Sequence, residues 1–467
     1  MKPSVLLFNS PIRQKKRDPL EVENLYPRIG IASIAACLQE NGIEVHIIDP
    51  EAEGLDSNGV KGRISKTSPG IVGIPAYTEE VCDAAYTAGL VKEIDPEIVT
   101  VIGGPHASAI PSETLEEFRA FDIAVTGEGE LTLLDIAMGE RLEGIKGIAF
   151  RDENIVVNEK RPLISSLDCL PFPAWHLHQT DRYRGSGLTS GFRKKRVDLE
   201  IPVESARGCP FNCIFCYRVC DNIRFKSPKR VADEVEWVIS EFGATKIHFT
   251  EGTFAVNKKI AIEMCDELIG RGLNKKITWS SGARAELTDM ELLTIMKRSG
   301  CAYLGFGAES GDNKILKIIH KGITAEQIER AFELCKEIGI ETEANFIIGH
   351  PFESEETVNR TIDFALSLQA DRATFAILVP FPGTVVRQMA EDNIGGLKIL
   401  SNDWSMYGKQ AGGPLELDQL PLGKLIGLQT KAYRKFYLRP SRFLKFASLL
   451  SFNRVLYSLK RFLANKG

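Results

Sequence analysis

Apolar and polar positions alternate in blocks along the first 150 residues of this 467-residue chain. Short apolar runs bounded by glycine, proline or polar residues predict strands, and longer stretches with helical spacing predict helices between them. Strands that alternate with helices are typical of a doubly wound parallel sheet. The predicted strands are 4–8, 44–49, 71–77, 99–104 and 122–130, and the predicted helices include 29–41 and 79–93.

A second series of strands and helices begins near residue 197 and continues to about residue 395. Six strands joined by right-handed helical crossovers would curl into a partial (β/α)6 barrel of the TIM type. The predicted strands are 197–205, 246–252, 277–284, 303–310, 343–350 and 373–381. Helices expected between them include 231–242, 289–299, 325–338 and 354–369.

These patterns predict an α/β fold in four parts. Residues 1–150 form a Rossmann-like doubly wound domain, and residues 197–395 form the partial barrel. Residues 151–196 combine a hairpin-like stretch, a proline-rich passage and a polar Gly/Ser/Arg passage, which together predict a linker. Residues 396–467 are irregular at first and then helical.

Several glycines and polar residues follow the strands of the first domain. Ligands of doubly wound sheets sit at the carboxyl ends of the strands. Glycine at such an end lets the backbone approach a large flat ligand or its phosphates. We therefore expect a cofactor to contact Tyr77, Gly103, Gly104, Gly127 and Glu128.

The charge is distributed unevenly. The net charge is −4, so no global basic field indicates nucleic acid, and no nucleic-acid-binding module is recognised. Residues 424–467 carry +11 without an acidic residue, which leaves −15 on the rest of the chain. Basic amphipathic helices can lie on anionic membranes; the alternative is a helical subdomain whose apolar face packs on the barrel. The N-terminus does not resemble a signal peptide, and no apolar run is long enough to span a membrane.

Ten cysteines are present, and four of them lie within the twelve residues 209–220. The others are scattered singly through apolar stretches, unlike a secreted disulfide framework. This distribution indicates a reducing, cytoplasmic compartment.

The segment ARGCPFNCIFCYR (206–218) places Cys209, Cys213 and Cys216 in a C-x3-C-x2-C spacing. Thiolates suit iron–sulfur clusters or zinc. Three protein ligands leave one iron of a four-iron cluster open to substrate, whereas structural zinc sites use four ligands. Cys220 could complete a closed zinc site, although the longer spacer that usually separates zinc-binding cysteine pairs is missing.

With Phe215 as its aromatic residue, this loop resembles the radical S-adenosylmethionine (SAM) signature C-x3-C-x-aromatic-C. The resemblance implies that the three thiolates hold a [4Fe-4S] cluster. It implies that the fourth iron chelates SAM, and that a 5′-deoxyadenosyl radical then abstracts hydrogen from the substrate. It also implies no ligand role for Cys220.

The resemblance extends over nearly the whole chain. Residues 1–150 resemble the cobalamin-binding module that precedes the radical domain in one large class, on the phrases YPRIGIASIAACLQENG, GGPHAS and VTGEGE. Later phrases that fit the class in this order are FTEGTF, GARAE, GAESG, IIGHPFESEET and PFPGT.

The class suggests roles for four residues at barrel strand ends. Glu251 would bind the ammonium group of SAM, although the family often has an Asp pair at this place. Arg284 would bind the SAM carboxylate as a bidentate partner. Glu309 and Ser310 would reach the ribose or the methionyl group. The alternative for each is a structural ion pair or surface contact.

The cobalamin module lacks the D-x-H-x-x-G motif that supplies a histidine to cobalt, and His106 lies in a different context. The resemblance therefore implies bound cobalamin with no protein histidine on cobalt. A degenerate module without cofactor is the alternative.

Three functions follow from these patterns. The first is a cobalamin-dependent radical SAM enzyme, most simply a C-methyltransferase. The second is a radical SAM oxidative cyclase or another carbon-skeleton-modifying enzyme. The third is a zinc-binding regulatory protein. The expected partners are a small-molecule or lipid substrate and an electron donor such as flavodoxin or ferredoxin, and not nucleic acid. The expected location is cytoplasmic, with membrane association through the basic C-terminus as an alternative.

Overall fold

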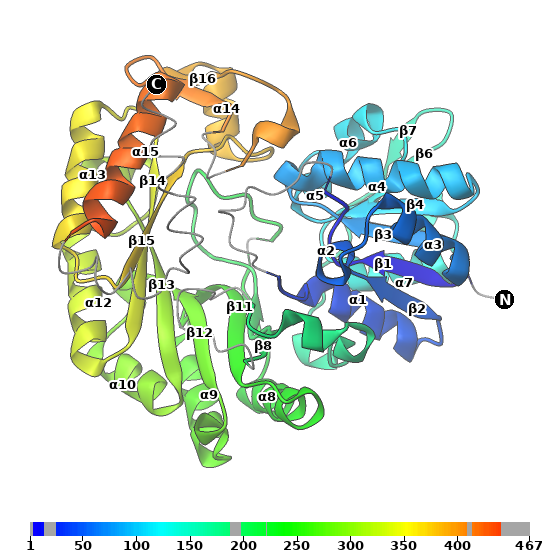
Figure 1. Ribbon diagram of the computed structural model, residues 1–467, viewed down its shortest axis with the longest axis horizontal. Coiled ribbons are helices and arrows are strands. Elements are labelled where there is room, and N and C mark those ends of the chain that lie inside the picture. The colour runs from blue at the N-terminus through cyan, green and yellow to red at the C-terminus, as the bar shows by residue number, and fades with distance from the viewer. Residues whose placement is uncertain (1–2, 14–24, 187–197, 221, 409–412, 440–467) are drawn as a thin grey trace.

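The computed structural model describes residues 3–13, 25–186, 198–220, 222–408 and 413–439. Two large β-sheets lie side by side, each flanked by helices (Figure 1). The predicted α/β fold, with a doubly wound sheet followed by a partial barrel and a C-terminal helix, is confirmed.

The first sheet has seven strands in the order β2-β1-β3-β4-β5-β6-β7. The first five pair in parallel, and the β6–β7 hairpin extends the sheet antiparallel to β5. The strand order reverses between β1 and β3, which makes this the switch point where such sheets bind ligands. The strands are β1 (Val5–Phe8), β2 (Val45–Ile48), β3 (Ile71–Pro75), β4 (Val99–Gly103), β5 (Ile123–Val125), β6 (Ile148–Arg151) and β7 (Ile155–Val157).

Helices cover both faces of this sheet. The helices are α1 (Ile29–Glu40), α2 (Pro50–Glu53), α3 (Ser57–Thr67), α4 (Val81–Ile94), α5 (Pro105–Ala109), α6 (Pro111–Glu117) and α7 (Gly129–Met138). Leu6 and Phe8 of β1 share a core with α3, α4 and α6, whereas Val5 and Leu7 share one with α1 and α7. Successive strand residues point to opposite faces, so a sheet buried on both faces needs a continuous apolar run.

The second sheet has six parallel strands in the order β15-β14-β13-β12-β11-β8. They are β8 (Glu200–Val203), β11 (Lys246–Phe254), β12 (Thr278–Ala283), β13 (Cys301–Glu309), β14 (Glu341–Ile348) and β15 (Arg372–Ile377). The helices that follow them are α8 (Pro228–Phe242), α9 (Lys258–Gly270), α10 (Met290–Arg298), α11 (Asn313–Ile318), α12 (Ala325–Ile338) and α13 (Glu355–Ser367). In β14 every second residue, from Thr342 to Ile348, is buried, as expected for a strand with one helix-covered face.

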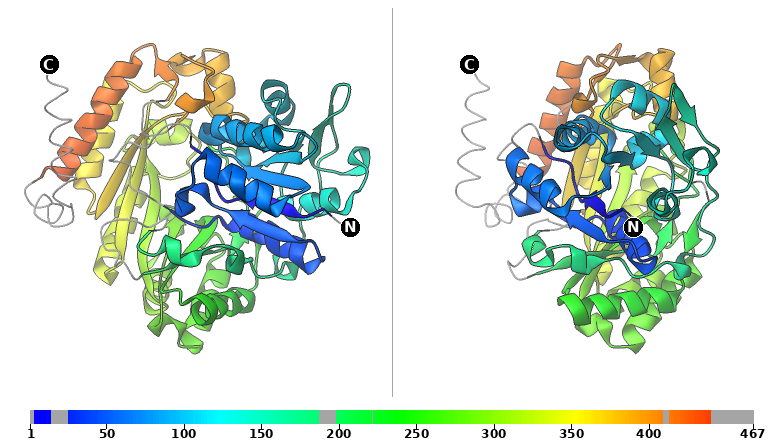
Figure 2. Two further views of the ribbon diagram at one scale, coloured as in Figure 1. Left: turned by 45° about the vertical axis from the view of Figure 1, so that its right-hand side comes forward. Right: turned by 90° about the vertical axis from the view of Figure 1, so that its right-hand side faces the viewer.

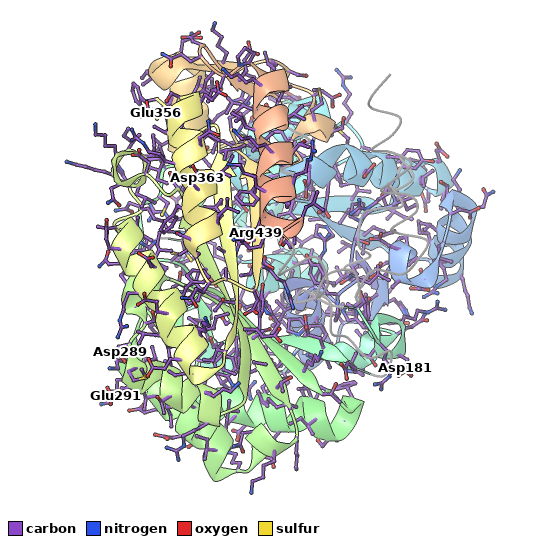
Figure 3. All side chains as sticks on the ribbon, turned by 60° about the vertical axis from the view of Figure 1, so that its left-hand side comes forward. Asp181, Asp289, Glu291, Glu356, Asp363 and Arg439 are labelled. Atoms are coloured by element: carbon purple, nitrogen blue, oxygen red, sulfur yellow. The ribbon has the colours of Figure 1, made fainter. Side chains whose placement is uncertain are left out.

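The described part of the basic C-terminal segment is α15 (Leu422–Tyr437), which lies along the outside of the barrel beside α13 (Figure 2). Its apolar face, with Leu425 and Phe436, is buried in the barrel core. Its basic face meets the acidic residues of α13, and Lys435 Nζ lies 3.2 Å from Asp363 Oδ1 (Figure 3). For this part of the segment, packing on the barrel explains the amphipathic pattern.

Other predicted features fall outside the described residues. These are residues 440–467 of the basic segment, residues 187–197 at the end of the predicted linker, and the side chain of Glu251. Within the part of the chain that is described, no helix is both long and apolar enough to cross a membrane.

The chain after β15 returns to the first domain. It forms α14 (Val385–Glu391) and the β16–β17 ribbon (Leu397–Ile399 with Leu415–Leu417). Gly383, in the turn before α14, has φ of 73°. A Cβ at Gly383 would lie 2.8 Å from the Tyr217 ring and 3.3 Å from the Cβ of Ala109 in α5. The barrel, the cysteine loop and the first domain therefore meet at a position where a side chain does not fit.

We expect Gly383→Ala to lower the thermal unfolding midpoint of the iron-free protein. The left-handed backbone alone costs about 1–2 kcal/mol for a residue with a Cβ, and the Tyr217 ring adds a clash. Gly89→Ala in α4 is the matched control, because no heavy atom lies within 4 Å of its added Cβ. Alanine should be neutral there or stabilise by roughly 0.5–1 kcal/mol. Equal midpoints for the two variants would contradict this account.

The turn after β14 is held by a buried carboxylate. Glu353 Oε2 accepts hydrogen bonds from the backbone N–H groups of Gly349 at 2.6 Å and His350 at 3.0 Å. Burial raises the pKa of Glu353 from 4.5 to about 8, because the charged form is poorly solvated there. Near neutral pH, Glu353 is therefore protonated in the folded protein, whereas in the unfolded chain, with a pKa of 4.5, it has already lost its proton.

This raised pKa predicts a pH dependence of stability. The contribution of Glu353 is fully present below pH 4.5 and is lost as the pH rises through about 8. In Glu353→Gln the amide oxygen can accept the same hydrogen bonds without titrating. Over this window, the free energy of unfolding of the wild type should fall relative to that of the variant, measured by urea denaturation. Parallel pH profiles would show that Glu353 has an ordinary pKa.

Candidate functional site

The cysteine loop is closed at its base by a two-stranded antiparallel ribbon. β9 (Ala206–Arg207) leads into the loop and β10 (Arg224–Phe225) leads out of it. Gly208 at the entrance has φ of 97°, and a Cβ there would lie 2.4 Å from the carbonyl oxygen of Asn222. The crossing of the two legs therefore requires glycine at this position.

The three predicted ligands differ in exposure along this loop. Cys213 is buried, Cys209 is partly buried and Cys216 is exposed, and all three are free thiols. Cys220 lies at the base of the loop, where its Sγ accepts a hydrogen bond from Arg224 Nη2 at 3.7 Å. A Cβ built on Gly208 would lie 3.1 Å from the same sulfur atom. This placement fits three cysteines that face a cofactor and a fourth that packs against the loop base.

Arg284, at the end of β12, holds the middle of the loop. Its guanidinium lies 3.7 Å from the ring centroid of Phe211, and Nη1 lies 3.7 Å from Cys213 Sγ. Nε donates to Glu286 at 2.5 Å, and Nη2 donates to the carbonyl oxygen of Lys321. The predicted contact between Arg284 and the SAM carboxylate stays a prediction, because protein groups engage its donors in this structure.

Backbone bonds tie the same part of the loop to two further barrel segments. Ile214 N–H donates to Ile319 at 3.2 Å, and Ile214 C=O accepts from Val386 at 3.1 Å. Phe215 lies 5.8 Å, centroid to centroid, from the ring of His350. His350 is fully buried, and burial together with the nearby Lys321 cation lowers its pKa to about 3, so the ring is neutral.

The end of β13 carries a buried ion pair next to the loop. Glu309 Oε1 lies 2.8 Å from Lys321 Nζ, and Glu309 has a left-handed φ of 61°. A Cβ on Gly307 would lie 2.5 Å from Glu309 Oε1 and 2.7 Å from Lys321 Nζ, so glycine leaves room for the pair. Ser310 bonds Thr361 Oγ1 at 3.0 Å and accepts from the backbone N–H of Asp312, and its predicted contact with SAM stays a prediction. Lys321 could not be predicted from the sequence, because a lysine followed by glycine after a helix belongs to no recognised motif.

The switch point of the first sheet presents an exposed aromatic residue. Tyr77 follows β3 and is 47% exposed, although the Arg28 guanidinium lies 5.4 Å from its ring centroid. Glu80 fixes Arg28 through bonds of 3.0 and 2.5 Å. Tyr77 is therefore held in place with its free face toward solvent, as a contact for a flat ligand requires.

The predicted glycines shape the neighbouring strand ends. Gly103 accepts a hydrogen bond from Ala76 N–H at 2.9 Å. Gly104 has φ of 101°, and a Cβ on it would lie 2.7 Å from Ala76 O, so only glycine allows this approach. Gly127 has φ of 77°, and its N–H donates to Ser108 Oγ at 3.1 Å.

Glu128 is engaged by protein groups on both oxygens. Arg207 Nη1 donates to Oε1 at 2.9 Å, and Oε2 accepts from Ile164 N–H at 2.7 Å and from Arg224 at 3.1 Å. Its predicted contact with a cofactor stays a prediction. What the structure adds is an ionic link to both legs of the cysteine loop.

His106 is enclosed rather than presented. Its ring is 1% exposed, lies 3.3 Å from Thr78 Oγ1 and meets the Trp404 ring edge-on at 5.1 Å. Burial lowers its pKa to about 4. The sequence could not indicate the Trp404 contact, because the two residues are far apart in the chain.

The donor set fits the implied groups. The three thiols are soft ligands on one open loop, and the partly exposed Cys209 and exposed Cys216 leave access for a further ligand. Among the described side chains, no three His, Cys, Asp or Glu residues gather as a site for a single metal ion. At the switch point, the exposed Tyr77 ring and the glycine strand ends fit a large flat group such as cobalamin.

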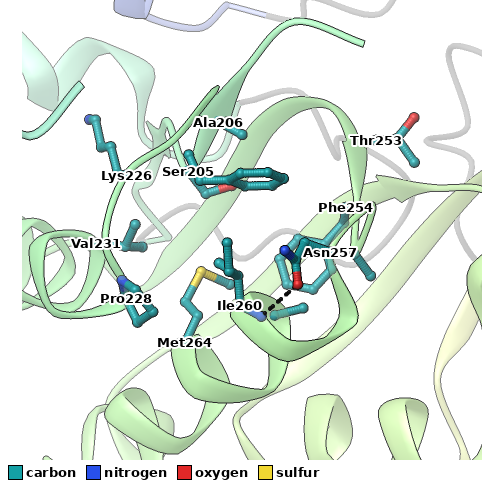
Figure 4. Close-up of a pocket in the computed structure, with 13 residues that line it drawn as sticks. Ser205, Ala206, Lys226, Pro228, Val231, Thr253, Phe254, Asn257, Ile260 and Met264 are labelled. Atoms are coloured by element: carbon teal, nitrogen blue, oxygen red, sulfur yellow. Dashed lines mark hydrogen bonds between the residues drawn. The ribbon is translucent and has the colours of Figure 1, made fainter. Parts of the chain in front are cut away.

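A small cavity beneath the loop base, shown in Figure 4, is a different kind of feature. It measures about 20 Å³, lies between β9, α8 and α9, and has Asn257 capping α9 at its edge. That volume holds about one water molecule, so it is not a substrate pocket.

Comparison with known proteins agrees with this geometry. Residues 203–365 match the radical SAM superfamily, and residues 20–137 match the B12 binding domain. An uncharacterized methyltransferase of Pyrococcus horikoshii is 35% identical over 427 residues, which cover 90% of this chain and 89% of that protein. An anaerobic magnesium-protoporphyrin IX monomethyl ester cyclase of Rubrivivax gelatinosus is 30% identical, with coverages of 90% and 75%.

The fold has a similar solved relative. The radical SAM methyltransferase TsrM from Kitasatospora setae, solved with cobalamin and a [4Fe-4S] cluster, superposes with a TM-score of 0.71 at 21% identity and covers 91% of this chain and 84% of that one. The superfamily match includes Cys209, Cys213 and Cys216, which favours the iron–sulfur interpretation over a zinc site. The chain is a member of the radical SAM superfamily, in the class that carries a B12 binding domain before the radical SAM domain.

Proposed function

We propose that this chain is a cobalamin-dependent radical SAM methyltransferase that methylates carbon. The observation that carries the proposal is the place of the cysteine loop. A Cβ built on Gly383 would lie 2.8 Å from the ring of Tyr217, the residue after Cys216, and 3.3 Å from Ala109 of the B12 binding domain. The loop is thus next to both parts that the two cofactors need. The relative from Pyrococcus horikoshii, described as a methyltransferase, supports the reaction type.

When bound, the cluster with SAM supplies radical chemistry, and cobalamin supplies the methyl group. The residues of this chain bind, orient and shield these groups. Cys209, Cys213 and Cys216 bind the cluster. Arg284 fixes the loop through Phe211 and Cys213.

The contacts with SAM are proposed at the barrel strand ends. Glu251 would bind the ammonium group, and Glu309 would bind the ribose or methionyl group, with Lys321 as its charge partner. Arg284 stays the proposed partner of the carboxylate, and Ser310, which also bonds Thr361 Oγ1 at 3.0 Å, stays a proposed contact of the ribose or methionyl group. Tyr77, Gly103, Gly104, Gly127 and Glu128 stay the proposed cobalamin contacts.

The substrate is proposed to be a small molecule, and a lipid is included in that class. A flavodoxin or ferredoxin is the proposed electron donor. A cytoplasmic location, and membrane contact through the basic residues after α15, belong to the same proposal.

A second candidate is oxidative cyclisation, which the cyclase relative at 30% identity favours. Product mass separates the two reactions, because methylation adds about 14 Da per event and cyclisation does not. The experiment is anaerobic reconstitution with iron, sulfide and cobalamin, followed by incubation with SAM and a reductant. Formation of 5′-deoxyadenosine supports the enzyme. One zinc per chain without sulfide would overturn both enzymatic functions.

We expect Cys213→Ala to abolish 5′-deoxyadenosine formation, because two thiolates cannot hold the cluster with one iron open. Cys220→Ala is the matched control from the same loop and should keep both the cluster and the product. Iron and sulfide content and 5′-deoxyadenosine by chromatography are the measurements. Equal loss in the two variants would show that the ligand assignment is wrong.

Tyr77→Ala should weaken cobalamin binding by at least about tenfold, because burying one aromatic face on the ligand contributes about 1.5 kcal/mol or more. Tyr86→Ala is the control, since Tyr86 is also a partly exposed tyrosine of the same domain, at 37% exposure. Absorbance titration of the purified chain with cobalamin gives both dissociation constants. Equal constants would place cobalamin away from the switch point.

A further inference from the structure

One partly buried ionic cluster joins the B12 binding domain to both legs of the cysteine loop. Arg207 and Arg224 face each other across the β9–β10 ribbon, in direct register. Both reach Glu128, with Nη1 of Arg207 at 2.9 Å and Nη1 of Arg224 at 3.1 Å. A single carboxylate of the first domain therefore holds the entrance and the exit of the loop.

The cluster is shielded from water. The side chains of Glu128, Arg207 and Arg224 are 10%, 15% and 13% exposed. Arg207 also bonds Glu130 at 2.6 Å and Glu204 at 2.8 Å. Ion pairs with this little exposure are screened much less than surface pairs, and loss of one partner leaves an uncompensated charge.

The cluster is also continuous with the proposed cobalamin site. Glu130 accepts from Ser33 Oγ of α1 at 2.8 Å. Arg28, the residue before α1, lies under the ring of Tyr77. One rigid helix thus connects the exposed aromatic residue at the switch point with the ions that hold the cysteine loop.

We propose that Glu128, besides its proposed contact with cobalamin, couples cobalamin binding to cluster binding by positioning Arg207 and Arg224. The inference rests on the proposed function, because it needs both cofactors. Ordering of the loop by the cluster fixes Arg207 and Arg224, and through Glu128 it fixes the strand ends that receive cobalamin. Such coupling is reciprocal, so each cofactor tightens the binding of the other by the same factor.

The test is the dissociation constant of cobalamin for the iron-free and the cluster-loaded full chain, measured by absorbance titration. In the wild type the cluster should tighten binding by about fivefold or more, the lower end of typical allosteric coupling. In Glu128→Gln the two constants should agree within about twofold. Arg224→Gln should lose part of the factor, because Arg207 still bonds Glu128 at 2.9 Å, and adding it to Glu128→Gln should cause no further loss.

A second readout uses the cluster itself. In the wild type, cobalamin should change the electron paramagnetic resonance spectrum of the reduced cluster, and in Glu128→Gln it should not. Glu159→Gln is the matched control, because Glu159 is an 80% exposed partner of Lys146 at 2.9 Å in a surface pair. It should behave like the wild type. If Glu128→Gln fails to fold, Arg224→Gln carries both readouts.

The outcomes separate this inference from the proposed function. A wild type that binds no cobalamin overturns both. A wild type that binds both cofactors, with equal cobalamin constants with and without the cluster, overturns the coupling alone. The coupling is also overturned if Glu128→Gln keeps the wild-type ratio of cobalamin dissociation constants without and with the cluster, and if cobalamin changes its cluster spectrum as in the wild type.

Discussion

The structure depends on holding three thiols open on a loop that has no regular structure of its own. The three thiols differ in exposure, from the buried Cys213 to the exposed Cys216, and no helix or strand among the described residues of the loop positions them. Its shape is fixed from outside instead. The β9–β10 ribbon closes its base, Arg284 holds its middle, and Tyr217 meets the turn at Gly383. Each of these supports comes from a different segment of the chain.

The fold itself could be predicted from local patterns. Apolar runs such as residues 4–8 and 99–104 form strands of the first sheet, which is buried on both faces. A strand in such a sheet needs a continuous apolar run, so these segments could be recognised from the sequence. The six barrel strands are recognisable in the same way, because glycine and polar residues mark where each one ends. The basic segment was harder. Its charge permitted a membrane surface, and only the contacts of α15 with α13, such as Lys435 with Asp363, show what covers its described part.

The site was predictable only where a motif carries the chemistry. The spacing of the three cysteines predicts them as cluster ligands, and the radical SAM match covers the segment that contains them. The partners of Arg284 and Glu128 could not be predicted, because they lie at the junction of segments distant in sequence. Lys321 was missed for the same reason, since nothing near it in the chain indicates Glu309 as a neighbour. Pairwise ionic contacts depend on the tertiary fold, whereas strand patterns depend on adjacent residues.

In the proposed enzyme, three protein thiolates bind the cluster and leave one iron open to SAM. Electron paramagnetic resonance of the reduced, anaerobically reconstituted wild type, recorded with and without SAM, tests it most directly. We expect a four-iron signal whose shape changes when SAM is added, because SAM would coordinate the open iron. A spectrum that SAM leaves unchanged, or a metal without any redox signal, would contradict it.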